Sequence, residues 1–228
     1  MKSKWFDLKN NAISLRKRGL SIRHIEKKYS IPRSTLSGWF SGIKLTANQE
    51  IKLEENKRLA LIEARKKAIL WHNAEKQKRI IKAELDAINI LNSINYNNKK
   101  IIELALAMLY LGEGFKKSNN TGIGNSDPQI LNFFISAIEK CFGFDRKGFR
   151  CELHLRADQD VDHVRKYWSK ELKIPLENFT SISIDNRTKG KKTYDYYKGV
   201  CVLRLGRTDI QRRLVFLSRK FCDIIINK

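Results

Sequence analysis

The chain has 228 residues, of which 46 are Lys or Arg and 24 are Asp or Glu, so its formal net charge is +22. This balance matches a polyanion, with nucleic acid as the first candidate and a membrane surface as its main competitor. No segment has the roughly 20 apolar residues of a transmembrane helix, and the N-terminus has no signal-peptide core. We therefore expect a cytoplasmic, nucleoid-associated protein without a membrane partner.

The first 45 residues predict a DNA-binding helical domain. Ser21 is a good N-cap, Ile25 is one of the apolar residues at helical spacing, and Pro32 opens a second helix after a tight turn. This pattern resembles the helix-turn-helix of resolvases and transposases, although a three-helix domain of another function would share it. The resemblance implies that the second helix enters the major groove and contacts DNA through short polar side chains and one arginine. These residues are Arg33, Ser34, Thr35 and Ser37.

Residues 46–98 form a basic helical linker in this interpretation. The segment is rich in Lys, Glu, Ala and Leu, lacks Pro and Gly, and begins at a cap, either Thr46 or Asn48. It predicts one or two long helices. A dimerising coil and a solvated spacer both fit, because the apolar stripe is partial and no heptad is sustained. The polar residues 95–100 mark the boundary with the next domain.

The remaining residues, 99–228, alternate helical and extended patterns, which indicates an α+β domain. Asp127 and Pro128 mark a capped helix that Gly143 ends, and Thr208 or Asp209 is expected to cap the last helix. In chain order the patterns predict a helix over 101–111, an extended segment over 121–126, a helix over 129–142, a strand over 149–156, a helix over 160–172, an extended segment over 179–184, a strand over 199–206 and a helix through Phe221.

Two parts of this domain carry charges suited to DNA. The strand over 149–156 alternates apolar and polar residues, so Arg150, Glu152, His154 and Arg156 share its wet face. The polar linker 185–194 is expected to be a mobile loop, either a plain solvated turn or a contact with the phosphate backbone. Its basic residues are Arg187, Lys189, Lys191 and Lys192.

Cysteine and histidine give no metal prediction. The four cysteines are far apart in apolar settings, which is typical of reduced core residues and not of a zinc site or a disulfide framework. The four histidines are scattered without ligand spacing.

Residues 106–114, with the sequence LAMLYLGEG, are the most informative stretch. Ala105 and Gly112 flank Leu109 on one helical face, which suits close packing against a second helix. Glu113 falls in the last turn, where the helix dipole disfavours a carboxylate by about 0.3–1 kcal/mol. A divalent cation would reverse this penalty. The alternative is a solvated glutamate at a frayed end, screened by Lys116 and Lys117.

This stretch resembles the LAGLIDADG motif of homing endonucleases. Leu106, Ala107 and Leu109 match, and Glu113 stands at the terminal acid, whereas Met108 replaces a glycine and Leu111 replaces the first acid. The resemblance implies an αββαββα domain with a mainly antiparallel sheet laid along the DNA major groove. It also implies a homodimer paired through the helix of residues 106–114.

The resemblance further implies the chemistry. Glu113 would be the catalytic carboxylate that holds Mg²⁺, the metal would activate a water and stabilise the leaving oxygen, and basic residues would neutralise charge on the phosphate. The candidates for this role are Lys116, Lys117, Arg156 and Arg204.

Two functions therefore compete. The first is a sequence-specific, homodimeric endonuclease that makes metal-dependent cuts in double-stranded DNA. The second is a catalytically silent transcriptional regulator that uses the same fold to bind an operator, because fold resemblance does not settle activity. An RNA-binding or maturase-like protein stays open, since basic charge does not distinguish RNA from DNA.

Overall fold

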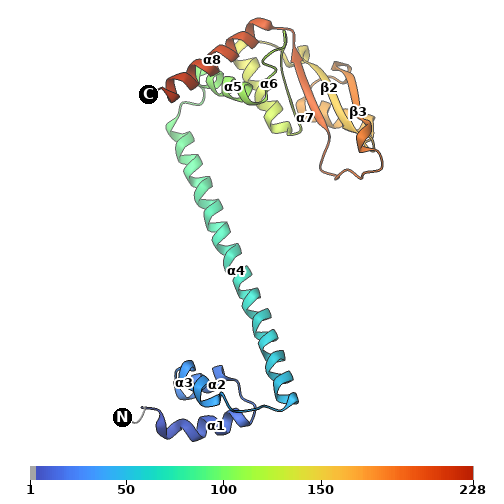
Figure 1. Cartoon of the computed structure of the whole chain (residues 1–228). Helices are drawn as coiled ribbons and strands as arrows, with labels where there is room; N and C mark the ends of the chain where they lie inside the picture. The colour runs from blue at the N-terminus through green and yellow to red at the C-terminus, as the bar shows by residue number, and fades with distance from the viewer. Residues whose placement is uncertain (1–3, 228) are drawn as a thin grey trace. The chain divides into compact units, whose positions relative to one another are not determined.

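The computed structural model describes residues 4–227, which form two compact units. The first unit extends to Ile88 and the second begins at Asn89 (Figure 1). Among the described helices, none has the length and apolarity needed to cross a bilayer.

The N-terminal part of the first unit is a small three-helix domain. The Ser21 hydroxyl accepts a hydrogen bond from the His24 backbone N–H at 3.1 Å, so the predicted cap is confirmed. Pro32 stands at the N-cap position of its helix, one residue earlier than a first-turn proline. Ile25 and Leu36 are fully buried in the core. The helices are α1 (Lys9–Lys17), α2 (Ile22–Tyr29) and α3 (Arg33–Phe40), after a 3-10 turn at Phe6–Leu8.

A single helix, α4 (Ala47–Ser93), follows this domain. It begins with a reciprocal capping box, in which Thr46 Oγ1 accepts the Gln49 N–H at 3.4 Å and Gln49 Oε1 accepts the Thr46 N–H at 3.1 Å. Thr46 is therefore the cap, and the linker is one helix. No side chain of α4 is buried.

The second unit contains the predicted helices and strands in a different arrangement from the implied one. Each expected element is present to within a few residues, but their order is α-β-α-β-α-β-β-α, so the implied αββαββα order is wrong. Helices separate β1 from β2 and β2 from β3. The elements are α5 (Lys99–Glu113), β1 (Thr121–Asn125), α6 (Pro128–Phe142), β2 (Arg150–Arg156), α7 (Val161–Leu172), β3 (Phe179–Asp185), β4 (Val200–Leu205) and α8 (Thr208–Ile226), with 3-10 turns at Arg146–Gly148, Leu176–Asn178 and Asn186–Thr188.

The four strands form one mixed sheet in the order β1-β4-β2-β3. Strand β4 is antiparallel to both β1 and β2, whereas β2 and β3 are parallel. The parallel pair follows from α7, because a helical crossover returns the chain in the same direction. The sheet is thus mainly antiparallel, as predicted, with one parallel edge pair.

Local caps fix most helix ends in this unit. Asp127 accepts the Gln129 N–H at 2.8 Å, Asp160 accepts the His163 N–H at 2.8 Å, and Gly143 ends α6 in the left-handed conformation. The prediction for α8 is wrong. Thr208 donates its hydroxyl hydrogen bond to the Asn119 carbonyl, and Asp209 pairs with Arg207, so α8 has no side-chain cap.

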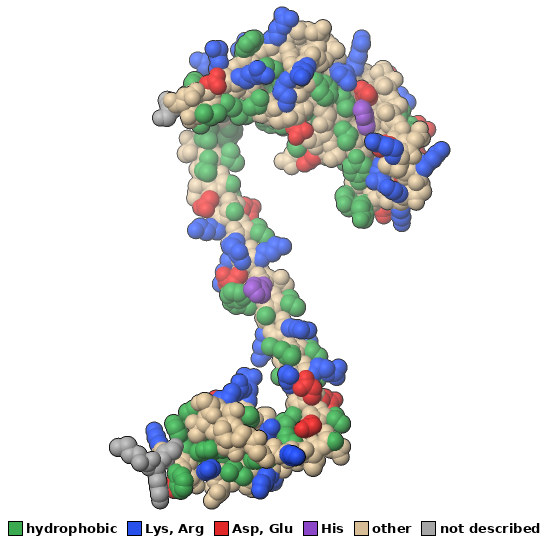
Figure 2. All heavy atoms as spheres, in the orientation of Figure 1, with side chains coloured by type: hydrophobic (Ala, Val, Ile, Leu, Met, Phe, Trp, Pro, Cys, Tyr) green, Lys and Arg blue, Asp and Glu red, His purple; other side chains and the backbone are tan. Residues whose placement is uncertain are grey.

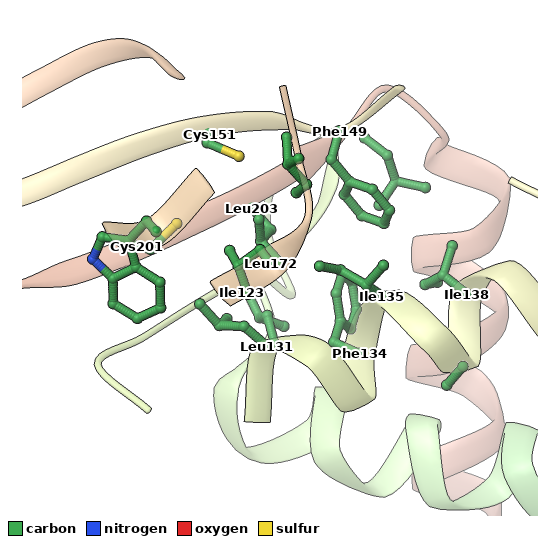
Figure 3. Close-up of a cluster of buried hydrophobic side chains, with 14 of the residues drawn as sticks. Ile123, Leu131, Phe134, Ile135, Ile138, Phe149, Cys151, Leu172, Cys201 and Leu203 are labelled. Carbon is green, nitrogen blue, oxygen red and sulfur yellow. The ribbon is translucent and has the colours of Figure 1, made fainter. Parts of the chain in front are cut away.

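The core lies against one face of the sheet (Figure 3). Inward side chains such as Ile123 and Leu203 lie beside Leu131 and Phe134 of α6 in one buried cluster. Three cysteines, Cys141, Cys151 and Cys201, are buried, and all four cysteines are free. The opposite face of the sheet therefore carries the polar side chains of the strands.

Candidate nucleic-acid interface

The first candidate surface is the start of α3. Arg33, Ser34 and Ser37 are exposed and Thr35 is half-buried, so all four predicted residues lie at the surface of the small domain. The Arg33 guanidinium is 3.7 Å from the carboxylate of Glu26 on α2. An exposed pair at this distance is weak, so Arg33 can exchange it for a phosphate or a base edge.

The second surface is the outer face of the sheet. The register places Arg150 on β2 opposite Arg204 on β4, while Glu152 and His154 follow along β2. Alternate residues of β2 are buried, so the predicted wet face is confirmed. It is less basic than the sequence suggests, because Glu152 accepts hydrogen bonds from Arg204 at 3.2 Å and from His154 at 2.9 Å.

A shallow pocket of about 530 Å³ lies at one end of this face. Three guanidinium groups line it, from Arg150, Arg204 and Arg207, together with Asn120. Sequence reasoning missed Arg207. The sequence gives little indication of it, because Arg207 lies outside the predicted strand, directly after Gly206. A hydrogen-bonded pair with Arg207 lowers the pKa of Asp209 to about 2, so this carboxylate stays ionised and holds the guanidinium.

The third candidate is the C-terminal end of α5. Glu113 is the last residue of this helix, as predicted, and its side chain is exposed, which the alternative of a solvated glutamate also expects. Within residues 4–227, no ion pair or side-chain hydrogen bond engages its carboxylate. An unpaired acid at the negative end of a helix dipole is electrostatically unfavourable.

One face of α5 is open. Ile101 and Met108 are 38% and 36% exposed, Ala105 and Gly112 are exposed, and Leu109 is half-buried. These positions follow one helical stripe that ends beside Glu113. A Cβ placed on Gly112 would meet no other atom within 4 Å, so nothing among the described residues of the second unit packs against that position. The opposite face of α5 packs on α6 and α8. It carries an ion pair in which the exposed Arg213 donates to both carboxylate oxygens of the buried Glu103.

Lys116 occupies the turn after α5. Its Nζ donates hydrogen bonds to the carbonyls of Leu111 at 2.6 Å and Gly112 at 3.2 Å, so it caps the helix end. The chain then extends along β1, where the Phe115 N–H donates to the Gly122 carbonyl. This path places the Phe115 ring under the Arg204 guanidinium, at 4.8 Å. Lys117 is exposed.

Gly114 is needed for close packing and not for a left-handed turn. Its φ is −80°, but a Cβ here would lie 2.5 Å from the Tyr110 ring and from the Tyr110 carbonyl oxygen. The Gly114 N–H donates to that carbonyl at 2.9 Å.

The carboxylate of Glu113 alone provides only half of the protein ligands of a two-carboxylate magnesium site. Mg²⁺ is commonly held by one or two carboxylates together with water and substrate phosphates. Glu113 supplies one carboxylate, and among the described residues no three His, Cys, Asp or Glu side chains come together as a metal site. Two copies of Glu113 brought together would supply the oxygen ligands that Mg²⁺ prefers.

The predicted basic residues of the loop between β3 and β4 form a group separate from the arginines on the outer face of the sheet. Arg187 donates to the carboxylate of Asp185 at 2.8 and 3.0 Å, and this pairing lowers the pKa of Asp185. Further along the loop, Lys189, Lys191 and Lys192 are exposed. Arg156 is the last residue of β2 and pairs in the strand register with Asp185, the residue before the loop. The structure thus brings Arg150, Arg204 and His154 onto two neighbouring strands, and the loop lysines lie outside these strands, between β3 and β4.

Comparisons with known proteins give no family. No protein-family model matches the chain, and no solved structure matches it significantly. A curated sequence with detectable similarity is the G-type lectin S-receptor-like serine/threonine-protein kinase SD1-1 of Arabidopsis thaliana, which is 26% identical over 148 residues. The match covers 56% of this chain but only 17% of the kinase, so the chain spans less than a fifth of that protein. Neither a family nor an activity follows from a likeness of this extent.

Proposed function

We propose that this protein binds double-stranded DNA sequence-specifically and, as a homodimer, cuts it in a metal-dependent reaction. The observation that carries the proposal is the open stripe of α5, which ends at an exposed and unpaired Glu113. A carboxylate in this position destabilises the helix end by about 0.3–1 kcal/mol, so a structural reason for it is lacking. The net charge of +22 and the helix-turn-helix domain support DNA as the partner.

The dimer in this proposal pairs α5 with α5 of a second copy. Ala105 and Gly112 allow two helix backbones to approach closely, and Ile101 and Met108 supply apolar surface. The two Glu113 carboxylates then face the same phosphodiester region. Mg²⁺ held there would supply Lewis-acid stabilisation and an activated water.

The neighbouring residues have distinct roles in this arrangement. Lys116 keeps a positive charge at the end of α5 through its two carbonyl contacts. Arg204 and Arg150 present guanidinium groups on the outer face of the sheet, which suits bidentate contact with phosphate oxygens. Glu152 holds Arg204 in place and limits its reach.

A transcriptional regulator is the second candidate, and Met108 favours it. This side chain lies on the open stripe where the motif has a glycine, so it keeps two paired helices further apart. Two Glu113 carboxylates held apart by this bulk would share a cation less well. The protein would then bind an operator without cutting it.

Cleavage of a supercoiled plasmid library that carries the gene's own flanking DNA distinguishes these functions. The reactions contain either Mg²⁺ or EDTA, and compare the wild type with Glu113→Gln and with Glu177→Gln, an exposed glutamate elsewhere in the unit, as the matched control. The nuclease predicts discrete Mg²⁺-dependent cuts that only Glu113→Gln abolishes, with binding retained. Equal binding by all three proteins without cuts supports the regulator. Cleavage that survives both EDTA and Glu113→Gln contradicts the proposed role of Glu113.

A further inference from the structure

The loop between β3 and β4, residues 186–199, carries two exposed tyrosines. Tyr194 and Tyr196 are 73% and 81% exposed. Their rings stack on each other, with centroids 5.4 Å apart and planes 13° from parallel. Each ring therefore covers part of one face of the other, and both rings stay largely open to solvent. Exposed apolar surface of this kind in a charged loop commonly marks a binding site.

The loop is anchored to the domain on both sides of these rings. On one side, the Asp158 carboxylate accepts the backbone N–H of Thr193 at 2.6 Å and the Thr193 hydroxyl at 2.5 Å. On the other side, the indole N–H of buried Trp168 donates to the Lys198 carbonyl at 2.8 Å. The segment that carries the tyrosines is thus held between two fixed points and extends away from the sheet (Figure 1).

The charge of the loop matches a polyanion. Residues 186–199 contain five basic residues and one acid, Asp195, which lies between the tyrosines in sequence. The Arg187 charge is already paired with Asp185, but Lys189, Lys191 and Lys192 are exposed and form no ion pair within residues 4–227. Figure 2 shows basic and hydrophobic side chains gathered over this end of the unit. Lysines can therefore hold phosphates while the rings remain open to a planar group.

We infer that this loop binds unpaired nucleobases of DNA, by stacking a base on the solvent-facing side of Tyr194 or Tyr196 while the lysines contact the flanking phosphates. Bases inside an intact duplex are covered on both faces, so only an unpaired or unstacked base offers its surface to a ring. The inference rests on the proposed DNA binding and adds the form of DNA that the protein prefers. Stacking of this type tolerates any sequence, so it complements the sequence-specific contacts proposed for α3.

Fluorescence anisotropy of the full-length protein tests the inference on two labelled probes, a duplex and the same duplex with a central unpaired bubble. The double variant Tyr194→Ala/Tyr196→Ala should lose about five- to 150-fold affinity for the bubble and little for the duplex. The double variant with Phe at both positions keeps the rings and should bind the bubble as the wild type does. Because both tyrosines are exposed, neither pair of changes disturbs the core.

The lysines provide a separate control. Lys191→Ala/Lys192→Ala should weaken binding to both probes alike and lower the salt slope by about one to two. A photoreactive 5-iodouracil in the bubble should cross-link to Tyr194 or Tyr196, and the same base inside the duplex should not.

The failures are distinguishable. If the wild type binds neither probe, the proposed DNA binding itself is wrong. If the wild type binds DNA but the Ala variant keeps the ratio of bubble to duplex affinity, the stacking inference alone is overturned. Tighter binding to an RNA strand of the same sequence than to the DNA bubble would overturn the assignment of DNA as the partner.

Discussion

The Glu113→Gln substitution tests whether the carboxylate at the end of α5 is kept for function at the expense of stability. Glu113 is exposed and unpaired among the described residues, and it lies where the unsatisfied carbonyls give the helix its negative end. Gln has nearly the same size and removes only the charge. The variant should therefore stabilise the second unit while it abolishes cleavage.

The expected size follows from the contacts at this helix end. A charge of unfavourable sign in the last turn costs about 0.3–1 kcal/mol. Lys116 contacts the carbonyls of Leu111 and Gly112, two residues and one residue before Glu113, so its charge offsets part of this cost. We therefore expect Glu113→Gln to raise the free energy of unfolding by an amount in the lower half of that range, and by less in high salt.

Lys116→Met makes the reasoning quantitative. The variant loses two hydrogen bonds and should lower the free energy of unfolding by about 0.5–1.5 kcal/mol. In this background the Glu113 charge has no nearby compensation, so the gain from Glu113→Gln should increase toward about 1 kcal/mol. The double-mutant cycle thus measures the coupling of the two charges.

The assay must report on the second unit alone, because the two units need not unfold together. Trp168 is fully buried in that unit, and the other tryptophans are Trp5, Trp39 and Trp71. Replacing these three by Phe leaves Trp168 fluorescence as the probe in urea titrations. Glu177→Gln is the control for removal of an exposed charge and should change little.

A loss of stability in Glu113→Gln would refute this reasoning. It would mean that the carboxylate makes favourable contacts, so its position would have a structural explanation. A gain in stability together with unchanged cleavage would leave the electrostatic argument intact and remove Glu113 from the chemistry.

Three further predictions concern other parts of the chain. Arg33→Ala should lower affinity for a specific duplex by about five- to 150-fold if the guanidinium contacts a base, with a smaller effect on nonspecific DNA, as competition binding would measure. Met108→Glu places a charge on the open stripe of α5 and should raise the dimer dissociation constant in sedimentation experiments, whereas Leu176→Glu, at another exposed site, should leave it unchanged. The side-chain hydrogen bond from Arg146 lowers the pKa of Glu139. This carboxylate therefore contributes stability above its unfolded pKa, and the contribution is lost as the pH falls through its folded pKa. Glu139→Gln should flatten the acid side of the curve of unfolding free energy against pH, and an unchanged curve would contradict this.

The implied αββαββα order is the clearest case in which a resemblance went further than the residues. The patterns themselves placed a helix between the first two strands, and the structure has that helix as α6. The likeness to the motif therefore rests on α5 and its acidic end, and the nuclease stays a proposal.

Local chemistry determined much of this protein from sequence alone. The caps at Ser21, Thr46, Asp127 and Asp160 use side chains that bond to backbone groups two or three residues away, so they can be predicted without the fold. The alternation along β2 likewise set which residues face water. The glycines around Glu113 predict its position in the last turn, although Gly112 is helical and Gly114 serves close packing against Tyr110.

Tertiary structure decided everything that joins distant residues. The neutralisation of Arg204 by Glu152 needs the β2–β4 pairing, and the ion pair of buried Glu103 with exposed Arg213 links residues 110 positions apart. The missing cap of α8 arises because Asn119 and Arg207 bind the side chains that the sequence assigned to it. The stacked tyrosines are held in place because Asp158 and Trp168 anchor the loop on both sides of them. Such contacts depend on strand order and helix packing, since a periodic pattern specifies a face but not the partner that covers it.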